Sequence, residues 1–337
     1  MTEPDHAESL HGEPRHAESM LPPLRIGTRS STLALAQTGM MAERLAEIAD
    51  RDVLLVPITS HGDVSTASLA SLGGTGVFVS ALRDALLADE CDVIVHSLKD
   101  LPTGELDGLF IAAIPTREDS RDALCARDGL TLETLPRGAT VGTGSPRRRA
   151  QLLAARPDLL VVDIRGNVDT RLGKVTSGEL DAVVLAAAGL SRIGRTEAIT
   201  QHLELDIWPC APGQGALALE TRSDESSRGT ASFVSQIDDI GARVTALAER
   251  AVLAGLEAGC AAPVGVTASI STVFDPDTMA ATHSLRIAAT VLSLDGQQQI
   301  SRTWSGASDH GDDGAASLVT ALLAAGAAEM APLGPGR

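Results

Sequence analysis

The sequence predicts an α/β protein with two similar lobes, each built on a mostly parallel sheet, and a smaller α+β domain at its C-terminal end. Three observations support this prediction. Short apolar runs alternate with helical periodicity from residue 24 onward, which is typical of a parallel sheet covered by helices. The same alternation starts again near Ser120. The last part of the chain instead combines a long helix, an antiparallel strand pair and a terminal helix.

The first lobe is predicted from its alternation of strands and helices. Ser30 or Ser31 is the expected cap of the first helix. The segment Ser60–Gly76 is rich in glycine and serine and is expected to be a mobile loop. The predicted strands are Leu24–Gly27, Val53–Thr59, Asp92–Ser97, Leu109–Ile114 and Ala216–Glu220, and the helices are Thr32–Ala49 and Val79–Ala88.

The second lobe repeats this pattern. Ser145 caps a helix that has Pro146 at its first position, where proline costs no hydrogen bond. Crossings near Ile114–Ser120 and Pro209–Gly213 join the two lobes and imply a cleft between them, because ligands bind at the carboxyl ends of such strands. The predicted strands are Thr140–Thr143, Leu159–Ile164 and Ala182–Ala187, and further helices are Val168–Ser177 and a short one through Arg192.

The third domain follows a polar linker, Ser223–Gly229. Its predicted helices are Ile240–Ala258 and Ala315–Met330, and its strands are Leu285–Leu294 and Gln299–Trp304. We therefore divide the chain into a tail (1–20), a first lobe (21–115 and 214–235), a second lobe (116–213) and a third domain (236–337).

The composition excludes several classes of protein. The 337 residues are 44% apolar, with 27 basic and 44 acidic side chains and a net charge of −17. This acidic balance argues against nucleic acid as a partner, since nucleic acid needs a broad basic face. No apolar run approaches the roughly 18–20 residues of a membrane span. The N-terminus lacks the apolar region of a secretory signal.

The cysteines and the N-terminal tail indicate a cytoplasmic protein with no metal site. The four cysteines are widely separated, with no CxxC and no metal-ligand spacing, and they suit a reducing compartment. They are Cys91, Cys125, Cys210 and Cys260. Residues 1–20 are polar and are expected to be disordered. They are either an extension ahead of a start near Met20 or, through their histidines, a regulatory or metal-binding segment.

Arginines concentrate in three glycine-containing turns between a strand and a helix. These turns are Gly27–Ser31, Gly142–Arg149 and Arg165–Arg171, and Arg192 follows a further strand. A helix N-terminus offers unpaired N–H groups, and arginine adds a planar fork that fits a carboxylate or phosphate. Three such turns on an acidic chain indicate a small ligand with several negative charges. For the second turn, a solvated basic face is an equal alternative.

Two further segments carry reactive groups. Lys99 and Asp100 follow a buried strand, where the cleft is expected. They are either a surface ion pair or a carboxylate held near a cationic centre. Cys260 lies just beyond a helix end between Gly259 and Ala261. It is either a small buried hydrophobe or an accessible thiol.

Together these segments resemble the porphobilinogen deaminase (hydroxymethylbilane synthase) family. The resemblance covers nearly all of the chain after the tail, and seven motifs in the right order make it specific. The motifs are Arg25–Arg29, Gly73–Phe78, His96–Asp100, Gly142–Arg148, Arg165–Arg171, Gly213–Ala216 and Glu257–Cys260.

The resemblance implies a fold, a reaction and a cofactor. Two of the three domains would be like the lobes of periplasmic binding proteins. A dipyrromethane cofactor would be attached to Cys260 by a thioether. The enzyme would be a transferase of heme biosynthesis that joins four porphobilinogen molecules head to tail, releases ammonia at each step, and gives hydroxymethylbilane after hydrolysis. A cytoplasmic monomer that contacts neither nucleic acid nor membrane is expected.

The resemblance also implies roles for individual residues. Asp100 would be catalytic: it would assist the loss of ammonia, stabilise the cation left behind and take up the proton of the attacked ring. The residues implied in cofactor binding are Cys260, Lys99, Asp100, Ser145, Arg147, Arg148 and Gly166. The residues implied in substrate binding are Arg29, Ser31, Phe78, Arg165, Arg171, Arg192 and Gln214.

One departure from the family and two rival hypotheses remain. Some family members carry lysines in the loop before Phe78, where this chain has Ser71 and Thr75. A solute-binding protein with the same two lobes would need a signal peptide, and it would need neither Cys260 nor a third domain. A regulatory domain that binds an anionic effector would need a DNA-binding module, and the sequence contains none.

Overall fold

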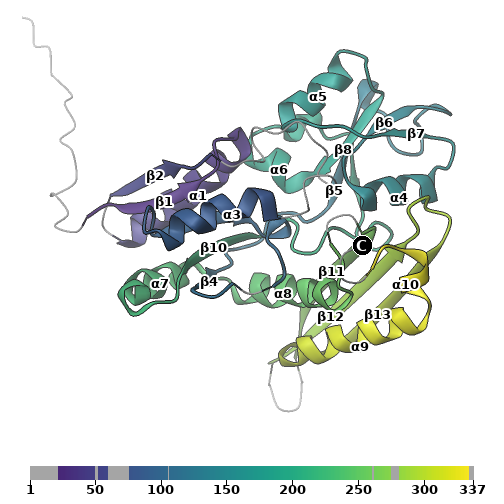
Figure 1. Cartoon of the computed structure of the whole chain (residues 1–337). Coiled ribbons are helices and arrows are strands. Elements are labelled where there is room, and N and C mark those ends of the chain that lie inside the picture. The colour runs from purple at the N-terminus through teal and green to yellow at the C-terminus, as the bar shows by residue number, and fades with distance from the viewer. Residues whose placement is uncertain are drawn as a thin grey trace, which may run out of the picture.

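The computed structural model describes residues 22–49, 52–59, 76–104, 106–259, 262–274 and 281–333. The predictions for the tail, and for the loop Ser60–Gly76 except its last residue, lie outside these ranges. Figure 1 shows two sheet-based lobes side by side and a third domain, in green and yellow, beneath the second lobe. The predicted fold class, two α/β lobes with a smaller α+β domain, is confirmed. No helix in the described part of the chain is long and apolar enough to span a membrane.

The first lobe is a five-stranded sheet in the order β2-β1-β3-β10-β4, in which only β10 runs antiparallel to its neighbours. α1 and α3 pack on opposite faces of this sheet. Ser31 caps α1, since its Oγ accepts a hydrogen bond from the Ala34 amide (3.3 Å). The elements are β1 (Leu24–Thr28), α1 (Thr32–Ala49), β2 (Val53–Pro57), α3 (Gly76–Leu87), β3 (Val93–Ser97), β4 (Leu109–Ala113) and β10 (Leu217–Arg222).

The second lobe has the same topology, with the strand order β7-β6-β8-β5-β9 and β5 as the antiparallel strand. In each lobe the antiparallel strand is the one that has just crossed over from the other lobe. The three-residue β9 is too short to leave a pattern in the sequence. The elements are β5 (Asp122–Ala126), β6 (Thr140–Gly142), α4 (Pro146–Ala155), β7 (Leu160–Val162), α5 (Val168–Thr176), β8 (Ala182–Ala186), α6 (Ala187–Arg192) and β9 (Gln201–Leu203).

The third domain is an antiparallel sheet, β11-β12-β13, with α8 and α9 packed on one face (Figure 1). The predicted strand pair is present, but β11 was missed although its residues alternate in the strand period. The predicted single terminal helix is wrong: Gly326, at φ 91°, separates α9 from α10. The elements are α8 (Ile240–Gly255), β11 (Val264–Phe274), β12 (Ala281–Leu292), β13 (Gln299–Ala307), α9 (Gly311–Ala324) and α10 (Ala327–Met330).

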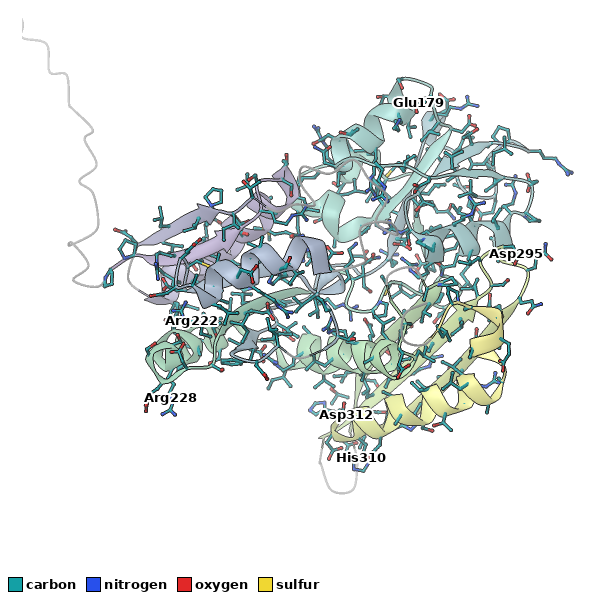
Figure 2. All side chains as sticks on the ribbon, viewed as in Figure 1. Glu179, Arg222, Arg228, Asp295, His310 and Asp312 are labelled. Carbon is teal, nitrogen blue, oxygen red and sulfur yellow. The ribbon has the colours of Figure 1, made fainter. Side chains whose placement is uncertain are left out.

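The segment Ser223–Gly229, predicted as a linker, is instead largely helical. A 3-10 turn covers Glu225–Ser227, and α7 (Arg228–Val234) follows it directly. Asp224 starts this turn by accepting a hydrogen bond from the Ser227 amide (2.9 Å). Polar composition therefore marked a helix start, not a flexible connection. The strands of each sheet fall within one part of the predicted domain division. The domain bounds themselves, 21–115 with 214–235, 116–213 and 236–337, stay a prediction. Figure 2 labels charged side chains at the outer ends of the three parts, among them Arg228, Glu179 and Asp312.

The helix α8 connects the third domain to the lobes. Its Ala242 and Ala246 pack in a core with residues of the first lobe, while its Val252 and Leu256 pack in the core of the third domain. Between them lies Glu249, which is 1% exposed. A buried carboxylate at this position needs partners.

Both crossings between the lobes supply partners for Glu249. Arg117 of the first crossing donates two hydrogen bonds to it, at 3.0 and 2.8 Å. The Gly213 amide of the second crossing donates a third at 2.8 Å, and the Ala268 amide of β11 a fourth at 2.8 Å. One carboxylate thus fastens the two interlobe crossings to the third domain.

We predict that Glu249→Gln lowers the free energy of unfolding by about 3–5 kcal/mol, because Arg117 then stays buried without a counter-charge. Denaturant unfolding followed by circular dichroism measures this loss. Arg127→Gln is the control, since it removes an exposed ion pair with Asp181 and is expected to change stability far less. Equal stabilities of the Glu249→Gln variant and the unmodified protein would contradict the prediction.

Candidate active site at the lobe boundary

Lys99 and Asp100 lie in a 3-10 turn, Leu98–Asp100, at the carboxyl end of β3. The side chain of Asp100 is exposed and that of Lys99 is half-buried. Arg250 of α8 holds the backbone of this segment: it donates to the carbonyls of Leu98 (3.2 Å), Leu101 (2.7 Å) and Pro102 (2.7 Å). Asp100 is therefore an exposed side chain on a turn whose backbone is anchored to the third domain.

Across the boundary, the helix α4 begins with the predicted cap. Ser145 Oγ accepts a hydrogen bond from the Arg148 amide (3.4 Å), and Pro146 occupies the first helical position. The first turn of α4 therefore contains two successive arginines. Arg147 and Arg148 are only 3% and 6% exposed, so the alternative of a solvated basic face is wrong.

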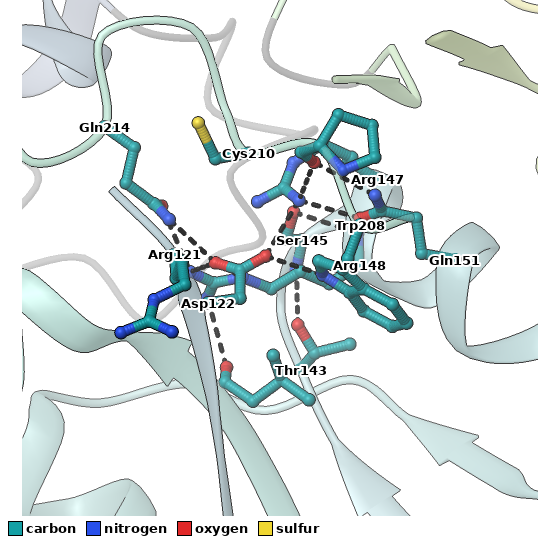
Figure 3. A network of polar contacts seen from close by, with 12 residues as sticks. Arg121, Asp122, Thr143, Ser145, Arg147, Arg148, Gln151, Trp208, Cys210 and Gln214 are labelled. Carbon is teal, nitrogen blue, oxygen red and sulfur yellow. Dashed lines mark hydrogen bonds and ion pairs between the residues drawn. The ribbon is translucent and has the colours of Figure 1, made fainter. Parts of the chain in front are cut away.

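Asp122, the first residue of β5, is the partner of both arginines (Figure 3). It is fully buried and accepts hydrogen bonds from Arg147 (2.8 Å), Arg148 (3.0 and 2.7 Å), the Trp208 indole (2.9 Å) and Gln214 (2.8 Å). Burial alone would raise the pKa of Asp122, but the two guanidinium charges outweigh it and hold this pKa well below its usual range. Sequence reasoning missed Asp122, although a carboxylate within an apolar strand was a visible signal.

Gln214, at the end of the second crossing, connects the two halves of the site. It is 1% exposed. Its amide nitrogen donates to the Ser120 carbonyl and to Asp122, both at 2.8 Å. Its amide oxygen accepts from Lys99 and from Arg148, both at 3.3 Å. Lys99 of the first lobe and Arg148 of the second therefore share one amide oxygen.

Two further predicted arginines of the second lobe, Arg171 and Arg192, donate hydrogen bonds to backbone carbonyls. Arg171 Nε donates to the Gly166 carbonyl (2.9 Å), and Gly166 has a φ of 102°. Arg192 Nη2 donates to the Gly215 carbonyl (2.6 Å). The Nε atoms of Arg147 and Arg192 are buried and have no hydrogen-bond partner among the described residues. Such buried donors are costly unless a ligand pairs with them.

The other predicted site residues are half-buried or lie outside the described residues. Arg29 and Arg165 are half-buried, as is Ser31, whose hydroxyl caps α1. Cys260 and the side chain of Phe78 lie outside the described residues, as do Ser71 and Thr75.

The cations of the site destabilise one another. Burial, together with Arg148 and Arg147, lowers the pKa of Lys99 to about 8 despite Asp100 nearby. Burial and the charges of Arg148 and Arg165 likewise lower the pKa of Arg171. Carboxylates bound among these groups would relieve both effects. The residues present therefore fit a small polyanion such as a pyrrole that carries acidic side chains.

Fold and site together define a class, a two-lobed α/β protein with a cationic site where the lobes meet. Residues 24–229 match the family model described as "Porphobilinogen deaminase, dipyromethane cofactor binding domain". Residues 243–323 match "Porphobilinogen deaminase, C-terminal domain". The chain belongs to the porphobilinogen deaminase family, as its motifs predicted.

Two curated relatives agree with this assignment. A porphobilinogen deaminase of Leifsonia xyli subsp. xyli is 53% identical over 321 residues, which cover 92% of this chain and 94% of that relative. One of Thermobifida fusca is 54% identical over 278 residues, covering 82% and 84%. An arginine-specific periplasmic binding protein of Salmonella typhimurium is similar in structure, at 11% identity and a TM-score of 0.37, over 68% of this chain and 97% of that one. The predicted function in tetrapyrrole biosynthesis and the dipyrromethane cofactor are confirmed.

We predict that Lys99 titrates near pH 8 in protein that lacks the cofactor, and at higher pH once carboxylates bind beside it. The chain has only two lysines, Lys99 and Lys174, so in a Lys174→Arg variant a lysine-specific ¹³C label gives one NMR signal. Because the folded pKa lies below the ordinary 10.5, this group makes stability rise with pH between about 8 and 10.5. A midpoint of 10 or above in the cofactor-free protein would contradict the crowding of cations.

Proposed function

We propose that this chain is a transferase that joins four porphobilinogen molecules head to tail, releases ammonia at each step, and frees hydroxymethylbilane by hydrolysis. The observation that carries the proposal is the convergence of Lys99 and Asp100 from one lobe with Arg147, Arg148 and Arg171 from the other. A growing chain of pyrroles carries an acetate and a propionate on each ring, and this cluster provides matching cations. We also propose that the enzyme acts as a monomer in the cytoplasm.

We propose that the dipyrromethane is held by a thioether to Cys260. The other three cysteines support this assignment, because burial raises the pKa of their thiols to about 11 at Cys91 and about 12 at Cys125 and Cys210. A thiol that resists ionisation is a poor nucleophile. When bound, the cofactor supplies the ring on which the product grows. Ser145, Arg147, Arg148, Lys99 and the Gly166 turn would bind its carboxylates.

The remaining roles follow from position. Asp100 would stabilise the positive charge that develops as ammonia leaves, and would accept the proton of the attacked ring. Its exposure and its anchored turn suit a group that must reach a succession of substrates. Arg29, Ser31, Phe78, Arg165, Arg171, Arg192 and Gln214 would bind or line the path of the substrate carboxylates.

We predict that the purified protein weighs more than its sequence by two linked pyrrole units and reacts with Ehrlich's reagent as a dipyrrole does. Cys260→Ser should abolish the added mass and turnover, because a hydroxyl is a far weaker nucleophile than a thiol. Intact-mass spectrometry measures the addition. Serine at 91, 125 or 210 is the matched control and should leave the added mass in place. An active preparation of unmodified mass would refute the attachment.

We predict that Asp100→Asn folds, keeps its cofactor and loses at least a hundredfold in turnover, because an amide neither neutralises a cation nor takes up a proton. Asp100→Glu should retain part of the activity, since the charge survives. Product formation from porphobilinogen, measured per molecule of loaded enzyme, tests both variants. If the asparagine variant worked as well as the unmodified enzyme, Asp100 would not be catalytic.

A further inference from the structure

The buried carboxylate of Asp122 uses the two arginines of α4 in different ways. Arg148 donates hydrogen bonds from Nε and Nη2 to Asp122 Oδ1. Its Nη1 donates to the Val184 carbonyl (3.1 Å). Its planar fork is thereby occupied by protein. Arg148 is held on three sides: by Asp122, by the backbone of β8 and by Gln214.

Arg147 is held differently, through its Nη1 atom. Its Nη1 donates to Asp122 Oδ2 (2.8 Å), to Gln151 Oε1 (2.7 Å) and to the Pro209 carbonyl (2.9 Å). Its Nε is buried without a partner in the described part of the chain. A guanidinium binds a carboxylate best along one edge, through two parallel N–H groups. Asp122 fixes one end of Arg147, and Nε stays unpaired among the described residues, as a donor that a ligand carboxylate could use.

The same carboxylate reaches the first lobe through one amide. Gln214 donates to Asp122 Oδ1 and accepts from Lys99, the residue before Asp100. The orientation of this amide is set by its donor side, because both N–H groups find acceptors at 2.8 Å. Its oxygen therefore must point at Lys99 and Arg148.

We propose that Asp122 is a positioning residue for cofactor binding: it aims the Nε edge of Arg147 at a cofactor carboxylate and, through Gln214, sets the place of Lys99. This rests on the proposed function, in which Arg147 and Lys99 bind the cofactor. Asp122 is fully buried among protein donors, so its role is exercised through the side chains that it holds. Without it, three cations would meet at the lobe boundary with no buried anion among them, and their mutual repulsion would spread them apart.

The test compares Asp122→Asn with a carboxylate that is equally buried but lies outside the site. Glu220 of β10 is 2% exposed and accepts two hydrogen bonds from Arg83, at 3.0 and 2.7 Å. Glu220→Gln therefore matches the loss of a buried, arginine-paired charge. Each variant is expressed at low temperature, and its soluble folded fraction is isolated by size-exclusion chromatography.

We predict that both variants melt at lower temperature but only Asp122→Asn loses cofactor. Intact-mass spectrometry of the folded fraction should show at least a tenfold lower share of loaded molecules for Asp122→Asn, and an unchanged share for Glu220→Gln. Asp122→Glu keeps the charge and should recover loading in part. A role in stability alone would lower the melting temperature without changing the loaded share per folded molecule.

Four results would decide the matter. Full loading of folded Asp122→Asn, or equal losses in Asp122→Asn and Glu220→Gln, would overturn the positioning role. If Asp122→Asn gives no folded fraction, the Asp122→Glu variant decides. Its longer side chain shifts the carboxylate, so full loading of this variant would also overturn the positioning role. An unmodified mass in the parent protein would instead overturn the proposed function, so the two failures are distinguishable.

Discussion

The structure depends on buried carboxylates that hold arginines in place. Glu249 fastens both interlobe crossings to α8, and Arg117 extends this link by donating its Nε to the Gln214 carbonyl (2.9 Å). The side chain of Gln214 then reaches Asp122. A continuous polar path therefore runs from the third domain, through the two interlobe crossings, to the arginines of the site. Since unpaired buried charges are very costly, each member of this path constrains the next.

This arrangement explains how an acidic chain can hold a cationic site. A net charge of −17 repels anions at a distance, but a buried charge acts on its immediate neighbours far more strongly than on distant groups. Selection for small polyanions then depends on local geometry. Arginine suits this task better than lysine, because its planar fork binds a carboxylate along an edge and it keeps its charge when buried. The single lysine of the site shows the contrast, since burial lowers its pKa to about 8.

The sequence predicted what is local and missed what is distant along the chain. The strand–helix alternation, the cap at Ser145 and the arginine-bearing turns follow from residues within a few positions of one another. The pairing of Asp122 with Arg147 joins positions 25 residues apart, and that of Arg117 with Glu249 spans 132. No periodicity encodes such partners. The prediction of a linker at Ser223–Gly229 was wrong for a related reason. Its polar residues begin a helix, and the apolar side of that helix packs against distant parts of the first lobe.

The contacts of Gln214 identify where the site is most easily rearranged. Its nitrogen side is held by two bonds of 2.8 Å, whereas its oxygen is shared between Lys99 and Arg148 at 3.3 Å, near the long end of the range for such bonds. A carboxylate accepts from a cation more strongly than an amide oxygen does. An anionic ligand would therefore draw Lys99 away from Gln214 before it disturbed Asp122 or Glu249, and the lysine NMR signal would report that release. The bonds of Gln214 to Ser120 and Asp122, which join the two lobes, would stay in place while Lys99 moves.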